Sequence, residues 1–347
     1  MPDSSETVLV TGGTGFLGSW CIATLLDRGY SVRTTVRDAG REGQVRAQLA
    51  AAGADPGDRL TIAVADLTSD AGWPEAVAGC KYVLHVASPF PPSQPKDPDD
   101  LIVPARDGSL RVIKAALAAG VERVVLTSSV ASIRGTRAAS QSAPFTEDDW
   151  TDGTDTSKSP YVRSKATAER AAWDYVEAEG QKDRLVTICP GAIIGPALSD
   201  DTSFSLELVE RLMTGIPAMP RLGYGLVDVR DVADMEVRAM TDPAAGGERF
   251  IAADEFMWMS DVAEVLKKRL PEAAGKVPTR KAPDVLIKVM SVFDPGIKSV
   301  VGDLGQRSDF SSEKARTTLG WKPIPVQDSV VDTAESLIEH GVVKAAA

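Results

Sequence analysis

Histidine and cysteine are scarce in this 347-residue sequence, and their scarcity excludes several kinds of chemistry. The two histidines are His85, in an apolar stretch, and His340, near the end. Neither lies in a nucleophile-elbow motif, which argues against a Ser-His-Asp triad. The three cysteines, Cys21, Cys80 and Cys189, stand far apart in apolar surroundings. We therefore expect buried free thiols rather than disulfides or a zinc site, and no metal.

Positive charge and long apolar runs are also lacking. The sequence has 38 Lys and Arg against 49 Asp and Glu, a formal net charge of -11 and a pI near 4.9. This balance argues against a nucleic-acid partner or an anionic membrane surface, since both need a basic footprint. No apolar run approaches the ~20 residues of a membrane-spanning helix, and the first six residues lack the basic start of a secretion signal. We therefore expect a cytoplasmic protein.

The sequence does contain a regular alternation of predicted strands and helices. Strands are expected at residues 7–10, 31–36, 60–65, 82–87, 123–127 and 185–189. Helices are expected over residues 16–27 and 42–52, within 98–119, and from just before 161 to 177. Such alternation predicts an α/β fold, a doubly wound parallel sheet covered by helices on both faces.

The alternation breaks at residues 190–196, where prolines and glycines cluster. We expect a dinucleotide-binding domain over 1–195, to which 226–253 return, and a smaller substrate lobe built mostly from 196–225 and 254–347. The C-terminal half should contain helices near 205–213, 260–269 and 284–292 and a strand at 249–252. The apolar run 256–259 is expected to be core, with a pocket lining as the alternative. Residues 138–158 could be a loop over the active site or a surface linker.

A glycine run from Thr11 to Gly18 joins the first predicted strand to the first helix. In one register Gly12 makes the tight turn, Gly15 lets the backbone approach a pyrophosphate, and Gly18 lets the helix pack closely on the strand. A second register starts at Gly13. In both, the helix N-terminus faces the phosphates. The predicted dinucleotide-binding residues of this turn, the signature of a Rossmann fold, are Gly12, Thr14, Gly15, Phe16, Leu17 and Gly18.

Tyr161 and Lys165 lie four residues apart in a predicted helix, a spacing that puts both on one face. A neighbouring ammonium would favour the ionised phenol, and a free tyrosine with a pKa near ~10 needs such help to act as an acid or base. Ser129 ends the fifth strand, at the carboxyl edge where doubly wound folds bind ligands. Its hydroxyl could then hydrogen-bond a carbonyl oxygen that Tyr161 protonates. The alternatives are a solvated Tyr-Lys pair and simple loop capping by the serine.

On these motifs the sequence resembles the extended short-chain dehydrogenase/reductases, within them the dihydroflavonol-reductase-like and aldehyde-reductase-like group. The resemblance covers nearly the whole chain. It rests on residues 11–18, 35–38, 65–67, 85–89, 127–129, 161–165, 190–196, 227–233 and 319–321. It implies that Ser129 polarises a carbonyl, that Tyr161 donates a proton, and that Lys165 lowers the pKa of the phenol and binds ribose. It also implies that Asp66 and Leu67 contact adenine and that Ala87 and Pro190 line the dinucleotide. Monomers and homodimers are both compatible with it.

The cofactor prediction depends on the end of the second strand. An NAD enzyme usually has an acidic residue there, whereas this strand ends in Arg37, followed by Asp38. Arg33 should share a strand face with Arg37, and a guanidinium matches phosphate geometry, so we expect NADPH. Arg37 as a mere surface charge is the alternative.

The expected reaction is hydride transfer from NADPH to an aldehyde or ketone, with a small-molecule carbonyl compound as substrate. Plant dihydroflavonol reductases generally carry Asn five residues after the serine, where this chain has Arg134, which argues against a flavonoid. A thioester is second choice, because the chain has no evident basic cluster for CoA. Two alternatives come from other classes: an NAD-dependent nucleotide-sugar epimerase or dehydratase, and a non-catalytic NADP-sensing module.

Overall fold

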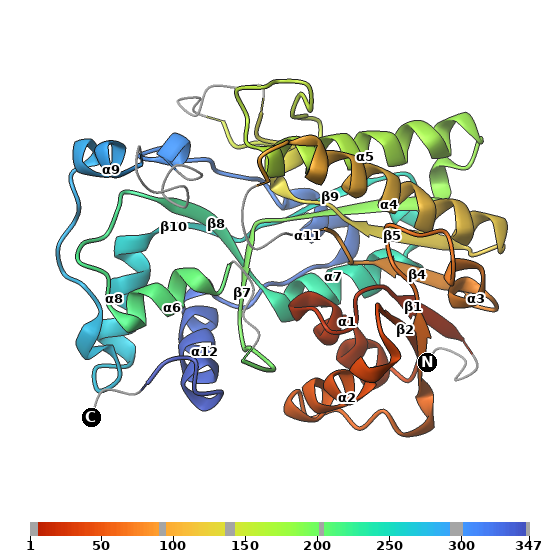
Figure 1. Cartoon of the computed structure of the whole chain (residues 1–347), viewed down its shortest axis with the longest axis horizontal. Coiled ribbons are helices and arrows are strands. Elements are labelled where there is room, and N and C mark those ends of the chain that lie inside the picture. The colour runs from red at the N-terminus through yellow and green to blue at the C-terminus, as the bar shows by residue number, and fades with distance from the viewer. Residues whose placement is uncertain (1–5, 90–94, 136–142, 201–204, 292–300, 345–347) are drawn as a thin grey trace.

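A seven-stranded parallel sheet forms the centre of the molecule, with strand order β3-β2-β1-β4-β5-β6-β9 (Figure 1). The computed structural model describes residues 6–89, 95–135, 143–200, 205–291 and 301–344. The strands are β1 Thr7–Val10, β2 Ser31–Val36, β3 Leu60–Val64, β4 Tyr82–His85, β5 Arg123–Thr127, β6 Leu185–Pro190 and β9 Arg249–Ala252. The predicted doubly wound α/β fold is confirmed.

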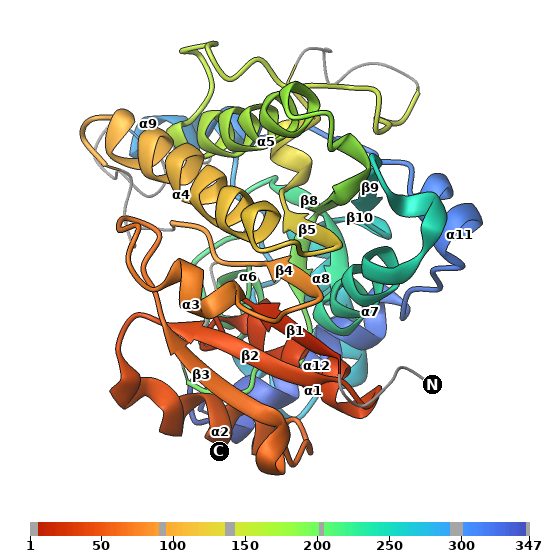
Figure 2. The same cartoon turned by 90° about the vertical axis from the view of Figure 1, so that its right-hand side faces the viewer.

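Helices cover both faces of this sheet (Figures 1 and 2). One face carries α3 Trp73–Val77, α4 Asp99–Ala118 and α5 Pro160–Ala178. The other carries α1 Phe16–Asp27, α2 Glu42–Ala51 and α7 Val229–Thr241. The predicted helices at 16–27, 42–52, 98–119 and 161–177 are confirmed to within two residues at each end. Helices α3 and α7 were not predicted from the sequence.

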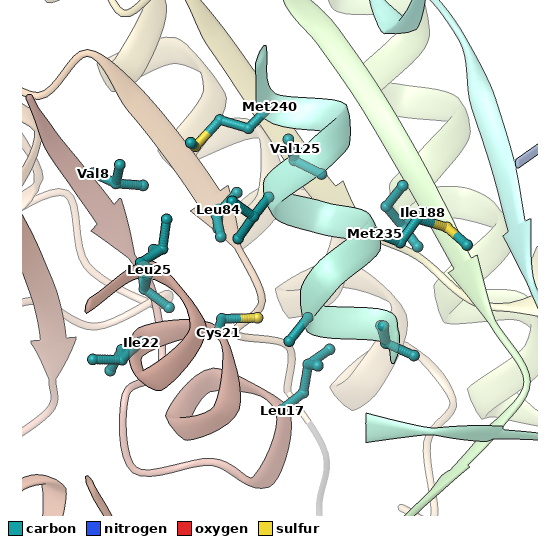
Figure 3. Close-up of a cluster of buried hydrophobic side chains, with 14 of the residues drawn as sticks. Val8, Leu17, Cys21, Ile22, Leu25, Leu84, Val125, Ile188, Met235 and Met240 are labelled. Atoms are coloured by element: carbon teal, nitrogen blue, oxygen red, sulfur yellow. The ribbon is translucent and has the colours of Figure 1, made fainter. Parts of the chain in front are cut away.

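The alternation of side chains along β1 explains why the sheet needs cover on both sides. Val8 and Val10 pack into the cluster formed with α1 and α7, whereas Leu9 between them packs into the cluster formed with α4 and α5. Figure 3 shows Leu17 and Cys21 of α1 directed toward the facing α7. The two helices are therefore fixed against the same stretch of sheet, with the start of α1 at its carboxyl edge.

A second, three-stranded sheet builds the rest of the molecule, with strand order β10-β8-β7. Its strands are β7 Ala192–Ile194, β8 Gly223–Asp228 and β10 Glu255–Trp258; β7 runs parallel to β8 and β10 antiparallel. Helices α6 Glu207–Thr214, α8 Met259–Arg269, α9 Asp284–Met290 and α12 Val326–Glu339 share a core with it. The helix α11 Glu313–Leu319 packs against the larger sheet. The expected domain boundaries stay a prediction.

Other expectations about the core agree with the structure. All three cysteines are free and buried. The expectation for the apolar run 256–259 holds for half of it: Met257 and Met259 belong to the core of the smaller sheet, whereas Phe256 and Trp258 are half-buried and pack edge to face, with ring centroids 4.8 Å apart. Across the described ranges, we find no helix with the length and apolar character needed to cross a membrane.

Glu236 is a carboxyl group buried between α7 and the central sheet. It accepts hydrogen bonds from the Thr127 hydroxyl at 2.5 Å and the Cys21 thiol at 3.5 Å. Burial raises the pKa of Glu236 to about 7 from an ordinary 4.5. The folded state therefore binds more protons than the unfolded state between these two values. Its contribution to stability is complete below pH 4.5 and is lost as the pH rises through 7.

We expect the Glu236→Gln variant to lack this pH-dependent loss of stability, because glutamine keeps the shape of the side chain and an acceptor oxygen but cannot ionise. The free energy of unfolding should then fall less between pH 5 and pH 8 than in the wild type, by up to about 3 kcal/mol. Urea denaturation at several pH values measures the difference. Identical pH dependence in both proteins would contradict the assignment.

Candidate active site

The residues predicted to form the site meet at the carboxyl edge of the seven-stranded sheet. Each follows or ends a different strand: Gly12 comes after β1, Arg37 after β2, Asp66 after β3, Ala87 after β4 and Ser129 after β5, and Pro190 ends β6. The strand order reverses between β1 and β4, which is the switch point where open α/β sheets bind ligands. The structure thus brings residues from six strands to one edge.

The glycine turn has the geometry of an anion cradle. Gly12 has φ of +74°, so the first of the two registers describes the tight turn. Its N–H donates to Thr35 Oγ1 at 3.1 Å. A Cβ added to Gly18 would lie 2.3 Å from the carbonyl oxygen of Gly12, so the helix approaches the turn more closely than any side chain would allow.

Helix α1 begins directly at this turn, and its N-terminus is open. Gly15 is the N-cap, and no side chain accepts hydrogen bonds from the first turn. The amide groups of Phe16, Leu17 and Gly18 have no acceptor within the helix, and the helix dipole is positive there. The side chain of Gln48 in α2 donates to the carbonyl oxygen of Thr14 at 3.1 Å and holds the turn. These features fit a bound pyrophosphate.

The groups beside the expected adenosine end of the dinucleotide are exposed. Arg37 and Asp38 both follow β2 on the surface. The carboxylate of Asp38 accepts the N–H of Gly40 at 2.8 Å and caps a short 3-10 turn. Hydrogen bonds from Thr68 lower the pKa of Asp66, and the positive charge of Arg37 lowers it further. Arg37 and Asp66 therefore lie near each other at the ends of two adjacent strands.

Arg33, which was expected to share a strand face with Arg37, does not reach the strand end where Arg37 lies. The Arg33 guanidinium donates to the backbone carbonyls of Ala76 at 3.0 Å and Ala78 at 2.7 Å, below α3. Period two places the two side chains on one face, but α3 covers the part of that face that Arg33 occupies. Farther along, Arg46 is paired with Glu42. Arg41 donates to Gln44 Oε1 at 3.1 Å, and Arg37 is exposed directly at the strand end.

The Ser129 and Tyr161 side chains meet beside this cradle, and Lys165 lies one helical turn after Tyr161 on the same face of α5. Ser159 caps α5 by accepting the N–H of Val162 at 3.3 Å, which starts the helix just before Tyr161. The hydroxyl groups of Ser129 and Tyr161 are hydrogen-bonded. Ser129 is buried, whereas Tyr161 and Lys165 keep part of their surface accessible. The predicted convergence of a serine hydroxyl and a phenol is therefore present.

The structure does not show the predicted lowering of the Tyr161 phenol pKa. Burial raises the pKa of Tyr161, and the hydrogen bond with Ser129 only partly opposes this rise. Burial also lowers the pKa of Lys165 to about 8, so its ammonium stays mostly charged at pH 7 but loses its proton just above neutral pH. The desolvation cost of each charged form outweighs the attraction that the four-residue spacing suggested. A neutral phenol can still donate a proton.

A hydrogen-bond network that was not predicted from the sequence supports Ala87. The Ala87 N–H donates to Thr11 Oγ1 at 2.9 Å, and the same oxygen lies 2.9 Å from Nδ1 of His85. His85 is fully buried, and burial together with the charge of Lys165 lowers its pKa to about 3. It is therefore a neutral ring that fixes the ends of β1 and β4. Its place in an apolar strand gave no signal of this role.

The segment 138–158 lies partly outside the described residues, which resume at 143. From there it packs on the molecule: Phe145 contacts Phe310, with ring centroids 5.6 Å apart. The Trp150 ring lies between the guanidinium groups of Arg170 and Arg249, at 3.6 and 3.5 Å from the ring centroid. These contacts anchor the segment to the middle of α5 and to β9.

Comparisons with known proteins agree with this geometry. The profile of the "NAD dependent epimerase/dehydratase family" matches residues 8–253. A cinnamoyl-CoA reductase of Petunia hybrida is 33% identical over 97% of this chain and 94% of its own length. A dihydroflavonol 4-reductase of Zea mays is 35% identical over 77% of this chain and 75% of its own. The crystal structure of the yeast methylglyoxal/isovaleraldehyde reductase Gre2, complexed with NADPH, superposes with a TM-score of 0.81 at 26% identity. That alignment covers 97% of this chain and 99% of the yeast protein.

The chain therefore belongs to the NAD dependent epimerase/dehydratase family, the extended short-chain dehydrogenase/reductases. The predicted resemblance is confirmed. The three relatives named above are reductases, which favours an oxidoreductase over the epimerase alternative.

Proposed function

We propose that this protein is an NADPH-dependent reductase of a small aldehyde or ketone, with Ser129, Tyr161 and Lys165 as its catalytic residues. The observation that carries the proposal is the meeting of a Ser129–Tyr161 hydroxyl pair and an uncapped glycine turn at one sheet edge. The reductase relatives support the same reaction class.

The residues of this edge fit a dinucleotide. The glycine turn and the first turn of α1 would hold the pyrophosphate, and Arg37 would pair with a 2′-phosphate. By the family resemblance, Asp66 and Leu67 would contact adenine, and Ala87 and Pro190 would line the dinucleotide. NADPH, when bound, supplies a hydride to the carbonyl carbon.

The chain's own residues handle the oxygen of the substrate. The Ser129 hydroxyl donates a hydrogen bond to the carbonyl oxygen and polarises the bond. As a hydride adds to the carbon, the electron pair of the C=O π bond moves to the oxygen, which takes the proton of the Tyr161 hydroxyl. The raised pKa of Tyr161 keeps that proton in place at neutral pH. The Lys165 ammonium stabilises the phenolate left behind and contacts ribose.

We propose aldehydes, ketones and ketoesters as substrates, with thioesters as second choice. Arg134 forms an ion pair with Asp303, and both charges act on Tyr224, whose pKa burial raises to about 12. This position therefore has a compensated cation instead of the asparagine of the plant flavonoid enzymes. A cytoplasmic location and either a monomer or a homodimer complete the proposal; the free cysteines suit a reducing compartment.

The test is a spectrophotometric panel that follows oxidation of NADPH, and separately of NADH, with aldehydes, ketones, ketoesters and a hydroxycinnamoyl thioester. We expect turnover with NADPH and at least one of the first three classes. Turnover of a nucleotide sugar without net oxidation would instead support the epimerase alternative. Binding of NADPH with no turnover of any compound would support the sensing module.

Arg37→Ala should raise the KM for NADPH about 10- to 100-fold, because a charge-assisted hydrogen bond to phosphate contributes about 1.5–3 kcal/mol. The KM for NADH should change little, since NADH lacks the 2′-phosphate. Steady-state kinetics with both cofactors measure the two effects. Lys268→Ala, which removes an exposed positive charge from α8, is the matched control. An unchanged KM for NADPH in Arg37→Ala would refute the assignment of Arg37.

A further inference from the structure

Glu169 is a buried carboxylate on the helix that carries Tyr161 and Lys165. It lies four residues after Lys165 and eight after Tyr161, so the three share one face of α5. Its side chain is fully buried, and its Oε1 accepts Nε of Arg249 at 2.7 Å. Arg249, in β9, is itself 8% exposed. Burying this ion pair is unfavourable by itself, because removing two charges from solvent is costly. A role in the site would explain why the pair is present.

The carboxylate holds the turn that presents Ser129. The hydroxyls of Ser128 and Ser132 both donate to Oε2 of Glu169 at 2.5 Å. These two serines flank Ser129, and the Ser132 N–H donates to the Ser129 carbonyl at 3.0 Å. Thr187 of β6 donates to the other carboxylate oxygen at 2.9 Å. Glu169 thus connects α5 to the turn that follows β5 and to β6.

Arg249 balances the charge of Glu169. Its Nη1 donates to the Glu147 and Asp149 carbonyl oxygens, at 2.5 and 2.9 Å, and its guanidinium stacks on Trp150. Burial acts to raise the pKa of Glu169, but the charge and hydrogen bonds of Arg249 lower it overall. The carboxylate is therefore ionised, and the pair is neutral as a whole.

The other titratable groups around Lys165 are uncharged at neutral pH. Burial raises the pKa of the Cys189 thiol to about 12 and that of Tyr161 above its usual value. The His85 ring, with a pKa near 3, is neutral. The negative charge acting on Lys165 therefore comes from Glu169, and it opposes the fall that burial causes in the pKa of Lys165. Without it, Arg249 would be an uncompensated cation next to the site.

We propose that Glu169 is a positioning residue for the reduction: it fixes the serine turn around Ser129 and keeps the Lys165 ammonium charged by balancing Arg249. The inference rests on the proposed function. A merely structural carboxylate would affect stability, whereas this role also affects the pH range in which the enzyme works.

The test is Glu169→Gln, which keeps the size and one acceptor but removes the charge. We expect a lower kcat and an alkaline limb of the kcat/KM profile displaced to lower pH by about one unit. Glu169→Asp, which keeps the charge on a shorter side chain, should lower kcat while the limb stays in place. Glu169→Gln with Arg249→Met removes both charges and should return the limb toward the wild-type pH.

Each outcome of these experiments supports or overturns the proposed role of Glu169. If the limb does not move in Glu169→Gln, or the double variant fails to restore it, the proposal is overturned. Circular dichroism and thermal unfolding establish that each variant is folded. If Glu169→Gln does not fold, the other two variants decide: an undiminished kcat in Glu169→Asp, or a displaced limb in the double variant, overturns the proposal. A wild-type enzyme that reduces no carbonyl compound refutes the proposed function itself, whereas an active enzyme with an unmoved limb refutes only the role of Glu169.

Discussion

Tyr161→Phe should reduce carbonyl turnover about 100- to 10,000-fold, the range that a positioned proton donor contributes. Phenylalanine retains the ring and removes only the hydroxyl group that is hydrogen-bonded to Ser129. The glycine turn is untouched, so the affinity for NADPH should stay within a few-fold of the wild type. Pre-steady-state and steady-state oxidation of NADPH, together with a fluorescence titration of NADPH binding, measure the two quantities.

Tyr175→Phe is the matched control for this variant. Tyr175 lies on the same helix, and its ring faces the Lys114 ammonium at 5.2 Å rather than the site. We expect ordinary kcat and KM for it. Full turnover in a folded Tyr161→Phe enzyme would show that another group protonates the substrate, and the catalytic assignment would have to be abandoned.

Gly18→Ala should strongly impair NADPH binding. The new methyl group would lie 2.3 Å from the Gly12 carbonyl oxygen, which also accepts the Gly15 N–H at 2.9 Å. Because backbone cannot rotate away as a side chain can, either α1 or the turn must move. We expect the dissociation constant for NADPH to rise at least about 10-fold and the free energy of unfolding to fall by about 1–3 kcal/mol. Isothermal titration and chemical denaturation measure these changes.

Gly43→Ala is the corresponding control. Gly43 lies in α2, and no atom comes within 4 Å of a Cβ placed there. Alanine should therefore stabilise the protein by about 0.4–1 kcal/mol and leave NADPH binding unchanged. If Gly18→Ala bound NADPH as tightly as Gly43→Ala, the close approach of helix and turn would have no role in cofactor binding.

Local patterns were sufficient to predict the larger sheet. Its inner strands are short apolar runs with a helix after each, and parallel pairing follows from that order. The smaller sheet was missed for physical reasons. β8 contains two glycines in six residues, β7 is three residues long and follows β6 almost directly, and neither length nor alternation marks such strands. Helix α7 was missed because residues 227–233 were considered only as a family motif.

The residues of the candidate site likewise fall into those that local sequence predicts and those that it does not. The glycine turn, Arg37, Ser129 and Tyr161 stand next to strand ends or helix starts, so local sequence predicts their location. Glu169 and Arg249 are 80 positions apart, and only the folded sheet brings β9 beside α5. Their pairing leaves no spacing pattern in the sequence. The pKa directions were also beyond prediction, because they depend on burial that only packing creates.

Besides the connections on either side of α11, the chain passes between the larger sheet with its helices and the smaller sheet at three very short connections. It passes from β6 to β7 through Gly191, from β8 directly into α7, and from β9 to β10 across residues 253–254. Opening the smaller sheet away from the larger one would have to bend all three crossings together, so a single hinge cannot serve. A fragment ending at residue 195 would also lose α7 and β9, and would expose Val125 and Ile188. Expressed alone, it should aggregate rather than form an independent dinucleotide-binding unit.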